Sequence, residues 1–286
     1  MVKQRGSKLV LGMLACIVVF ALATAGFVSV VRGERAAAVA ASAAGATAAV
    51  PPTPVPAPID SAKVHILMYH HLDDDGEKLG ADYHQLSVSP QDFREQMAWL
   101  KGNGYHTITF AQLEAAFRGE VTLPPNPVII TFDDGWDDIY HEAYPILREH
   151  GQVATFFIAT NWIDNLEGTV EWPQIREMSE GGMEFGSHSS THPYLTQSEP
   201  HLLTWELKAS KAALEEVTGK SITALAYPFG LYDDRVIAAA REIGYRTACT
   251  IDPGHTARAG ELMTLPRLWV YGWHDLEDFA QVLKSS

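Results

Sequence analysis

The sequence predicts an α/β fold: a distorted parallel (β/α) barrel of about seven strands, preceded by an N-terminal apolar helix and a flexible linker. Short apolar runs alternate with amphipathic runs from residue 61 to the end of the chain. The alternation repeats roughly seven or eight times in about 225 residues, which favours a closed parallel barrel over an open sheet. Some apolar runs stop abruptly at polar residues, as strands do where an active site forms at their carboxyl ends.

The expected strands are short and mostly apolar. The clearest is the β-branched run VIITF, which ends at two adjacent aspartates and a glycine. The expected strands cover 64–68, 128–132, 154–158, 183–187, 225–227, 246–249 and 265–270.

The expected helices are marked by their ends. Ser89 followed by a proline is a cap with proline in the first turn, and Thr109 with Gln112 forms a capping-box pattern. Asp233 and Asp275 are further expected caps. Glycines at 151, 219 and 244 are expected to end the helices that precede them. The expected helices begin at 90 and 110, cover 140–150, 172–180, 200–217 and 234–243, and end with one from 276 onward.

The first sixty residues differ from the rest of the chain. Lys3, Arg5 and Lys8 precede 9–31, an uncharged and mostly apolar run of 23 residues. Such a run can span a bilayer, and the leading positive charges favour an exported chain anchored at residues 1–31. Cleavage after Ala25 is the alternative and would leave a secreted or periplasmic protein. Residues 32–60, rich in Ala and Pro, are expected to be a linker, and 61–286 the catalytic domain.

The charge of the chain excludes some partners. The formal charge is −14, and the first sixty residues hold five Lys or Arg against two Asp or Glu, which leaves −17 for residues 61–286. A surface this acidic is a poor match for nucleic acid or anionic headgroups. Cys249 is the only cysteine in that part of the sequence, so an internal disulfide is excluded and stability must come from the core.

Two groups of polar residues follow expected strands. Asp133 and Asp134 follow the strand at 128–132, and His188 and His192 follow the strand at 183–187. Adjacent carboxylates repel each other unless a cation holds them, and a spacing of four places both imidazoles on one side of a helical turn. An Asx-turn and two surface histidines are the alternative interpretation. Together the groups predict three ligands and one open position, the pattern of metal-assisted hydrolysis.

These motifs resemble a known family. TFDDG, then HSSTHP, then YPFG, in this order, is similar to the signature of the polysaccharide deacetylases, carbohydrate esterase family four. The resemblance implies a distorted β/α barrel in which Asp134, His188 and His192 bind a divalent metal. It also implies that Asp133 is the general base and that the backbone N–H of Phe229 stabilises the oxyanion. The metal is expected to be zinc, with cobalt or nickel as alternatives.

The chain departs from the family pattern at two places. Ala226 stands where the family usually has an arginine that orients the base, and the customary C-terminal Leu-x-His is missing, with Leu-Pro-Arg267 near its place. An N-terminal Tyr-His70 element instead resembles that of the poly-β-1,6-N-acetylglucosamine deacetylases. The resemblance to this branch implies that His70 is the general acid. His274 is the next candidate.

The expected function is removal of N-acetyl groups from an extracellular N-acetylglucosamine polymer. Trp136 and Tyr194 directly follow the two metal motifs and are expected to flank a sugar ring. Alternative substrates are peptidoglycan, chitin oligomers and acetylated xylan. A non-catalytic glycan-binding module is the alternative from another class, and Ala226 is the feature in its favour. The sequence indicates no obligate protein partner.

Overall fold

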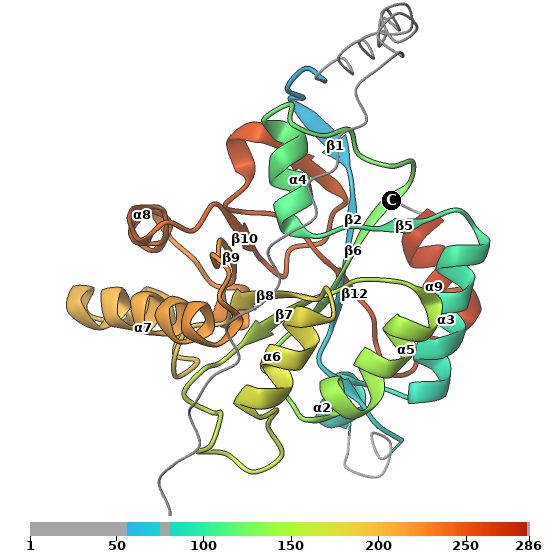
Figure 1. Ribbon diagram of the computed structural model, residues 1–286, viewed down its shortest axis with the longest axis horizontal. Helices are drawn as coiled ribbons and strands as arrows, with labels where there is room; N and C mark the ends of the chain where they lie inside the picture. The colour runs from blue at the N-terminus through green and yellow to red at the C-terminus, as the bar shows by residue number, and fades with distance from the viewer. Residues whose placement is uncertain (1–55, 75–80, 285–286) are drawn as a thin grey trace, which may run out of the picture. The chain divides into compact units, whose positions relative to one another are not determined.

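The computed structural model describes residues 56–74 and 81–284 (Figure 1). The predicted membrane segment 1–31 and most of the predicted linker 32–60 lie outside these residues, so both stay predictions. Within the described ranges, no helix combines the length and apolarity that crossing a bilayer requires.

Seven strands pair edge to edge, and every pairing between them is parallel. Their order across the sheet is β10 (Thr247–Cys249), β9 (Ala224–Ala226), β8 (Glu184–Ser187), β7 (Thr155–Ile158), β6 (Pro127–Phe132), β2 (His65–Tyr69) and β12 (Leu268–Trp269). The short strand β5 (His106–Thr107) also pairs with β6. A parallel bridge between Cys249 and Leu265 joins the end of the sheet at β10 to the segment before β12. The predicted barrel of about seven strands is confirmed.

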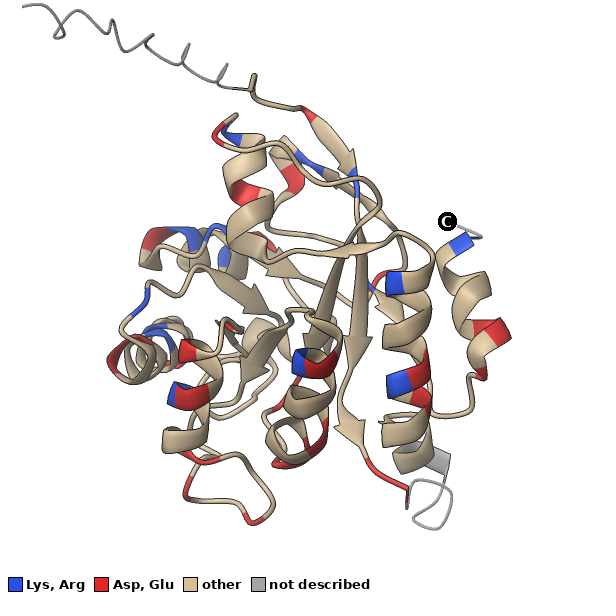
Figure 2. Cartoon of the chain, turned by 45° about the vertical axis from the view of Figure 1, so that its right-hand side comes forward, with Lys and Arg blue, Asp and Glu red and all other residues tan. Residues whose placement is uncertain are grey.

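Helices cover the outside of this barrel (Figure 1). They are α2 (Ala81–His84), α3 (Pro90–Gly102), α4 (Phe110–Phe117), α5 (Tyr144–His150), α6 (Trp172–Glu180), α7 (Pro200–Thr218), α8 (Asp234–Ile243) and α9 (Leu276–Lys284). Helix α3 packs against α5 and α9, and α7 packs against α6 and α8. Asp and Glu residues lie mainly on these helices and on loops (Figure 2).

The helix ends follow the predicted signals. Ser89 accepts a hydrogen bond from the backbone N–H of Asp92, and both halves of the capping box at Thr109 are present. Asp233 accepts from the N–H of Val236, and Gly219 ends α7 in the left-handed conformation. These contacts satisfy backbone groups that have no partner within the helix.

The core has two layers because side chains alternate along each strand. Leu67 and Tyr69 of β2 pack in the layer between the sheet and the helices, whereas Ile66 packs in the barrel interior. On β6, Ile130 belongs to the outer layer and Ile129 to the interior. Continuing this alternation past the strand ends directs His70 and Asp133 toward the interior at the carboxyl end of the barrel.

Several short elements were not predicted. Strand β1 (Ser61–Lys63) pairs antiparallel with β11 (Thr256–Arg258), and β3 (His71–Leu72) pairs with β4 (Ser87–Val88). A π-helical turn, Ile139–Ala143, precedes α5, and single 3₁₀ turns occupy Leu195–Gln197, Pro228–Gly230 and Ala259–Glu261. Pieces of two or three residues are too short to show a period in the sequence.

Candidate active site

Three predicted ligands converge at the carboxyl ends of β6 and β8. The Nε2 atoms of His188 and His192 each lie 3.5 Å from Oδ1 of Asp134, and the two Nε2 atoms lie 3.2 Å apart. Ligand atoms about 2.0–2.1 Å from a tetrahedral metal ion are roughly 3.4 Å from one another. The spacing of these three atoms therefore fits a divalent metal ion bound between them.

The histidines converge through an irregular loop, so the predicted helical turn is wrong. Ser189 and His192 have φ values of 64° and 59°, and neither residue belongs to a helix. The left-handed conformation is uncommon for residues other than glycine, and the fold must hold it in place. Two such residues bend the chain sharply enough to bring both imidazoles together.

Glu206 holds this loop, although the sequence analysis gave it no role. It lies on α7 and is buried. Its Oε2 accepts hydrogen bonds from the backbone N–H groups of Ser190 (2.9 Å) and Thr191 (2.8 Å), and its Oε1 accepts from the Thr191 hydroxyl at 2.5 Å. One carboxylate thus fixes the residues between the two histidines. A glutamate at one position of an amphipathic helix gives no sequence signal for this role.

The protonation of the histidines suits metal binding. Nδ1 of His188 lies 2.8 Å from the carbonyl oxygen of Ala226. A carbonyl can only accept, so Nδ1 carries the proton and Nε2 presents its lone pair to the triad. Burial lowers the pKa of His192 to about 4, which favours the neutral imidazole that metals require.

Asp133 is held by a buried arginine. Nη1 and Nη2 of Arg267 each donate to one oxygen of Asp133 at 2.7 Å. Arg267 is 0% exposed and Asp133 is 2% exposed. Burial alone would raise the pKa of Asp133, but the Arg267 guanidinium holds it well below its usual range. Asp133 is therefore an ionised carboxylate that is itself almost fully buried.

Arg267 resolves the absence of an arginine at Ala226. Its Nε donates to the carbonyl oxygen of Thr250 at 2.9 Å, and its Nη1 also lies 3.2 Å from the hydroxyl of Thr131. These contacts fix the guanidinium plane, so the orienting arginine comes from the segment before β12. The only sequence signal was a charged residue within the apolar run 265–270.

His70 lies in the same cavity as Asp133, about sixty residues before it in sequence. Its ring stacks on Trp269, with ring centroids 5.8 Å apart and planes at 19°. Burial lowers the pKa of His70, and the charges of Asp133 and Asp134 oppose this shift. His274 lies elsewhere: it lines a separate groove, and its Nδ1 accepts from the N–H of Tyr271 at 3.2 Å.

Phe229 forms part of the cavity wall in a left-handed conformation, with φ 60° and ψ 10°. Within its turn, the N–H of Gly230 donates to the carbonyl oxygen of Tyr227 at 2.8 Å, and the N–H of Leu231 donates to that of Pro228 at 3.2 Å. The Phe229 ring stacks on Tyr194 with centroids 4.2 Å apart, and both rings are more than two-fifths exposed. The pair forms an exposed apolar surface beside His192.

Trp136 lies beside Asp134, and its contact with a sugar ring stays a prediction. Its indole N–H donates to Oδ2 of Asp134 at 3.1 Å, and its ring stacks on His71 with centroids 4.6 Å apart. It is not one of the residues that line the metal cavity. Its contacts orient the Asp134 carboxylate.

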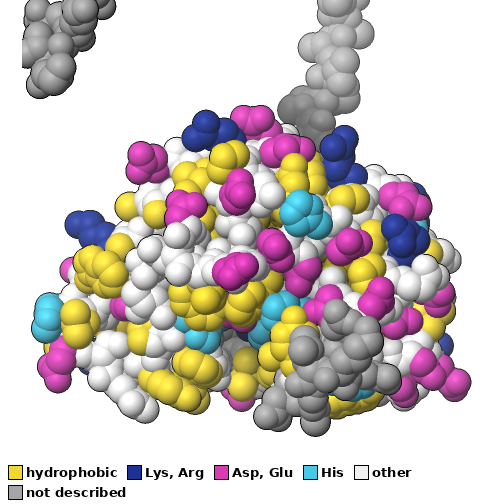
Figure 3. All heavy atoms as spheres, turned by 90° about the horizontal axis from the view of Figure 1, so that it is seen from below, with side chains coloured by type: hydrophobic (Ala, Val, Ile, Leu, Met, Phe, Trp, Pro, Cys, Tyr) yellow, Lys and Arg dark blue, Asp and Glu magenta, His cyan; other side chains and the backbone are white. Residues whose placement is uncertain are grey.

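The cavity around the triad has a volume of about 340 Å³. Figure 3 shows histidine side chains in a hollow bordered by hydrophobic side chains on this face. The lining residues are His70, Gln85, Leu86, Asp133, Asp134, His188, His192, Tyr227, Phe229, Gly230, Ile251, Arg267 and Trp269.

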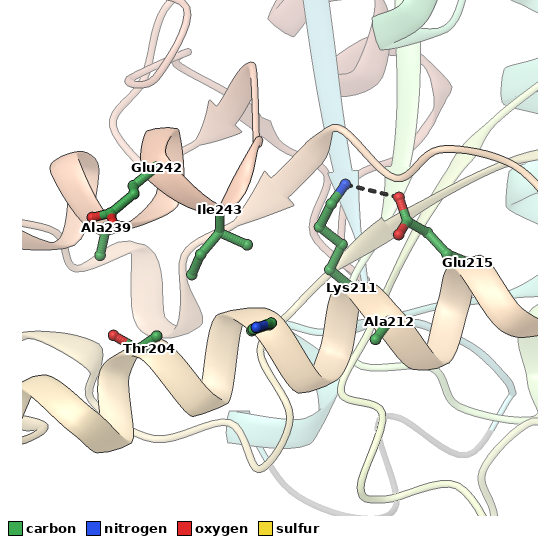
Figure 4. Close-up of a pocket in the computed structure, with 8 residues that line it drawn as sticks. Thr204, Lys211, Ala212, Glu215, Ala239, Glu242 and Ile243 are labelled. Atoms are coloured by element: carbon green, nitrogen blue, oxygen red, sulfur yellow. Dashed lines mark ion pairs between the residues drawn. The ribbon is translucent and has the colours of Figure 1, made fainter.

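A groove between α7 and α8 is larger, about 430 Å³, but has no comparable chemistry (Figure 4). Its Lys211 forms an ion pair of 2.9 Å with Glu215 and also donates to the carbonyl oxygen of Ile222. The groove contains none of the residues around the triad. The candidate active site is therefore the metal cavity.

Comparison with known proteins shows the family to which the chain belongs. The family model for polysaccharide deacetylase matches residues 120–248. YxkH of Bacillus subtilis strain 168, whose name assigns it provisionally to the polysaccharide deacetylases, is 31% identical over 209 residues, which are 73% of this chain and 72% of that protein. A solved polysaccharide deacetylase from Bacillus cereus superposes with a TM-score of 0.69 at 31% identity, covering 78% of this chain and 69% of the other. The chain belongs to the polysaccharide deacetylase family.

Some relatives have more specific names. The poly-beta-1,6-N-acetyl-D-glucosamine N-deacetylase of Staphylococcus epidermidis is 28% identical over 197 residues, which are 64% of this chain and 68% of that protein. The protein of the same name in Escherichia coli strain K12 is longer, and the match covers 38% of it.

Proposed function

We propose that this protein is a metal-dependent N-deacetylase acting on an extracellular N-acetylglucosamine polymer, with free amines and acetate as products. One observation carries the proposal: the Asp134, His188 and His192 triad lies in one cavity with a carboxylate that Arg267 keeps ionised. A divalent ion held by the triad would polarise the acetyl carbonyl and activate water for attack. The ligand set suits zinc, and also cobalt or nickel.

Asp133 is the proposed general base. The attacking water must lose a proton as its oxygen bonds to the acetyl carbon, and an ionised carboxylate in the same cavity can accept it. The paired guanidinium limits the rotation of Asp133 and aims its carboxylate. The backbone N–H of Phe229 is the proposed donor to the oxyanion that forms on the acetyl oxygen.

His70 is the proposed general acid. When the carbon–nitrogen bond breaks, the sugar nitrogen needs a proton because an amide anion is too basic to leave. His70 and Asp133 line the same cavity, so a different side chain can carry out each of the two proton transfers. The lowered pKa of His70 makes its protonated form a stronger acid.

The polymer substrate is supported by the named relatives and by the charge of the chain. The matched poly-beta-1,6-N-acetyl-D-glucosamine N-deacetylases motivate the choice of polymer. A domain with a formal charge of −17 at residues 61–286 favours a neutral substrate and a product that gains positive charge. The apolar segment 9–31 supports an exported protein tethered at its N-terminus, with secretion after cleavage as the alternative.

Two alternative functions have different support. Peptidoglycan, chitin oligomers or acetylated xylan would require the same chemistry on another glycan. A non-catalytic glycan-binding module was favoured by Ala226 alone. Arg267 supplies a guanidinium to Asp133, so Ala226 no longer favours a non-catalytic module.

Acetate release from a panel of glycans tests the proposal. The full chain is incubated with poly-β-1,6-N-acetylglucosamine, chitin oligomers, peptidoglycan and acetylated xylan, with the Asp133→Asn variant as a matched control. We expect release chiefly from the first substrate and a loss of about 10² or more in the variant. Equal release by both proteins, or release only from xylan, would contradict the proposal.

A further inference from the structure

Three aromatic rings form a stack that begins at the active-site cavity. The ring centroids of Trp269 and Tyr271 lie 5.4 Å apart with planes at 12°, and those of Tyr271 and Trp273 lie 4.8 Å apart with planes at 10°. Flat rings in contact are roughly 3.5–4.0 Å apart, so these parallel rings are offset and part of each face stays uncovered. We call Trp269, Tyr271 and Trp273 the aromatic ladder. It starts next to His70, which stacks on Trp269.

The ladder follows from the local chain geometry. Trp269 ends β12, and the chain then turns: the N–H of His274 donates to the carbonyl oxygen of Tyr271 at 3.0 Å, and Gly272 and Trp273 lie within this turn. The backbone at Gly272 packs closely on the end of α2 and on β4: a Cβ there would collide with the carbonyl oxygens of His84 and Ser87. The ladder therefore rests on a fixed part of the fold.

A groove borders Trp269 and Tyr271 of the ladder and adjoins the metal cavity at Trp269. It has a volume of about 560 Å³, and Trp269 lines both this groove and the metal cavity. Tyr271 and His274 also line the groove, and its lining includes no Lys or Arg. At the outer end, Trp273 is 52% exposed, the most exposed large hydrophobic side chain in the described part of the chain.

We propose that the aromatic ladder and its groove bind sugar rings that flank the N-acetyl group in the metal cavity. This inference rests on the proposed function and extends it to a binding site for the neighbouring residues of the polymer. A β-linked pyranose presents a face of C–H groups, and its contact with an aromatic face removes apolar area of both from water. A lining without cationic side chains suits a neutral glycan and disfavours an anionic one.

The proposal has a second chemical consequence. Deacetylation converts a neutral N-acetyl sugar into an ammonium sugar, and aromatic faces attract cations. The ladder can therefore hold both acetylated and deacetylated residues of one chain. The Tyr194 and Phe229 pair contacts His192, whereas the ladder contacts His70, so the two aromatic surfaces adjoin different residues of the cavity.

The length dependence of catalysis tests the proposal. The Trp273→Ala and Tyr271→Leu variants are compared with wild type on N-acetylglucosamine oligomers from one to six residues long. Trp205→Ala is the matched control, since Trp205 is 49% exposed and lies on α7, away from the ladder. We expect KM for the longest oligomers to rise on the order of tenfold in both ladder variants, with kcat little changed, as for lost uniform binding. The shortest oligomers should show a much smaller change.

A binding measurement distinguishes failure of the ladder proposal from failure of the proposed function. Calorimetric titration of the hexamer into Asp133→Asn, and into the same variant carrying Trp273→Ala, needs no turnover. Weaker binding in the double variant supports the ladder even if the wild-type protein releases no acetate. If both proteins bind the hexamer equally, or if Trp273→Ala and Trp205→Ala have the same length dependence, the ladder proposal is overturned.

Discussion

Arg267 and Asp133 form a bidentate ion pair inside the barrel, with both nitrogen-to-oxygen distances at 2.7 Å. The two residues are 134 positions apart in sequence: Asp133 directly follows β6, and Arg267 directly precedes β12. A buried guanidinium needs a full set of acceptors, and Arg267 finds them in Asp133, Thr131 and Thr250. This pair keeps a carboxylate charged where burial would otherwise favour its neutral form.

Replacing Arg267 by Lys should impair catalysis more than stability. Lysine keeps the positive charge but cannot donate two parallel hydrogen bonds, so Asp133 loses its fixed orientation. We expect kcat to fall roughly 10- to 100-fold and the acid limb of the pH–rate profile to move to higher pH. A profile that keeps its position would show that Arg267 does not control the pKa of Asp133.

His70→Ala should affect amide and ester substrates differently. An activated aryl ester releases a phenolate that leaves without help, whereas the sugar nitrogen requires a proton. We expect amide hydrolysis to fall by about 10²–10⁴ and ester hydrolysis to fall far less. His274→Ala is the control, because His274 lines the outer groove. Equal losses on the two substrates would assign His70 to positioning.

Glu206→Gln should weaken metal binding without touching a ligand. The variant keeps the size of the side chain, but one acceptor oxygen becomes an NH₂ group. That group then faces either the backbone N–H donors of Ser190 and Thr191 or the donating hydroxyl of Thr191. Loss of outer hydrogen bonds typically lowers metal affinity about 10- to 100-fold. Glu216→Gln on the exposed side of the same helix is the matched control. The measurement is the metal dissociation constant of each variant. Equal dissociation constants in the two variants would show that Glu206 does not support the metal site.

His65 should make the fold sensitive to acid. Burial, with the charges of Lys63 and His255, lowers the pKa of His65 from 6.5 to about 4. As the pH falls, His65 takes up a proton at a higher pH in the unfolded chain than in the folded chain. The contribution of neutral His65 to the free energy of unfolding is therefore complete above pH 6.5 and is lost as the pH falls toward about 4. The free energy of unfolding of His65→Phe should depend less steeply on pH across this window. If the free energy of unfolding depends on pH equally steeply in the wild type and in His65→Phe, the low pKa of folded His65 is contradicted.

The sequence predicted the barrel because its helices and strands carry local signals. The caps at Ser89, Thr109 and Asp233 and the glycine at 219 fixed several helix ends within a residue or two. The strand ends then placed Asp133 and Asp134 near the two histidines. These signals depend only on near neighbours in sequence.

The supporting contacts could not be predicted because they join distant residues. Arg267 reaches Asp133 across 134 positions, and Glu206 reaches the histidine loop from another helix. The left-handed conformations of Ser189 and His192 also have no local cause, since neither residue is a glycine. Tertiary packing imposes both features.

The most direct test of the central claim measures acetate release against metal content in the same samples. The full chain is stripped with a chelator, metal content is measured by mass spectrometry, and zinc, cobalt or nickel is returned stepwise to poly-β-1,6-N-acetylglucosamine reactions. We expect no acetate release from the stripped protein and activity that rises in proportion to metal bound, up to about one ion per chain. Full acetate release by the stripped protein, or full metal occupancy in His188→Ala, would contradict the account.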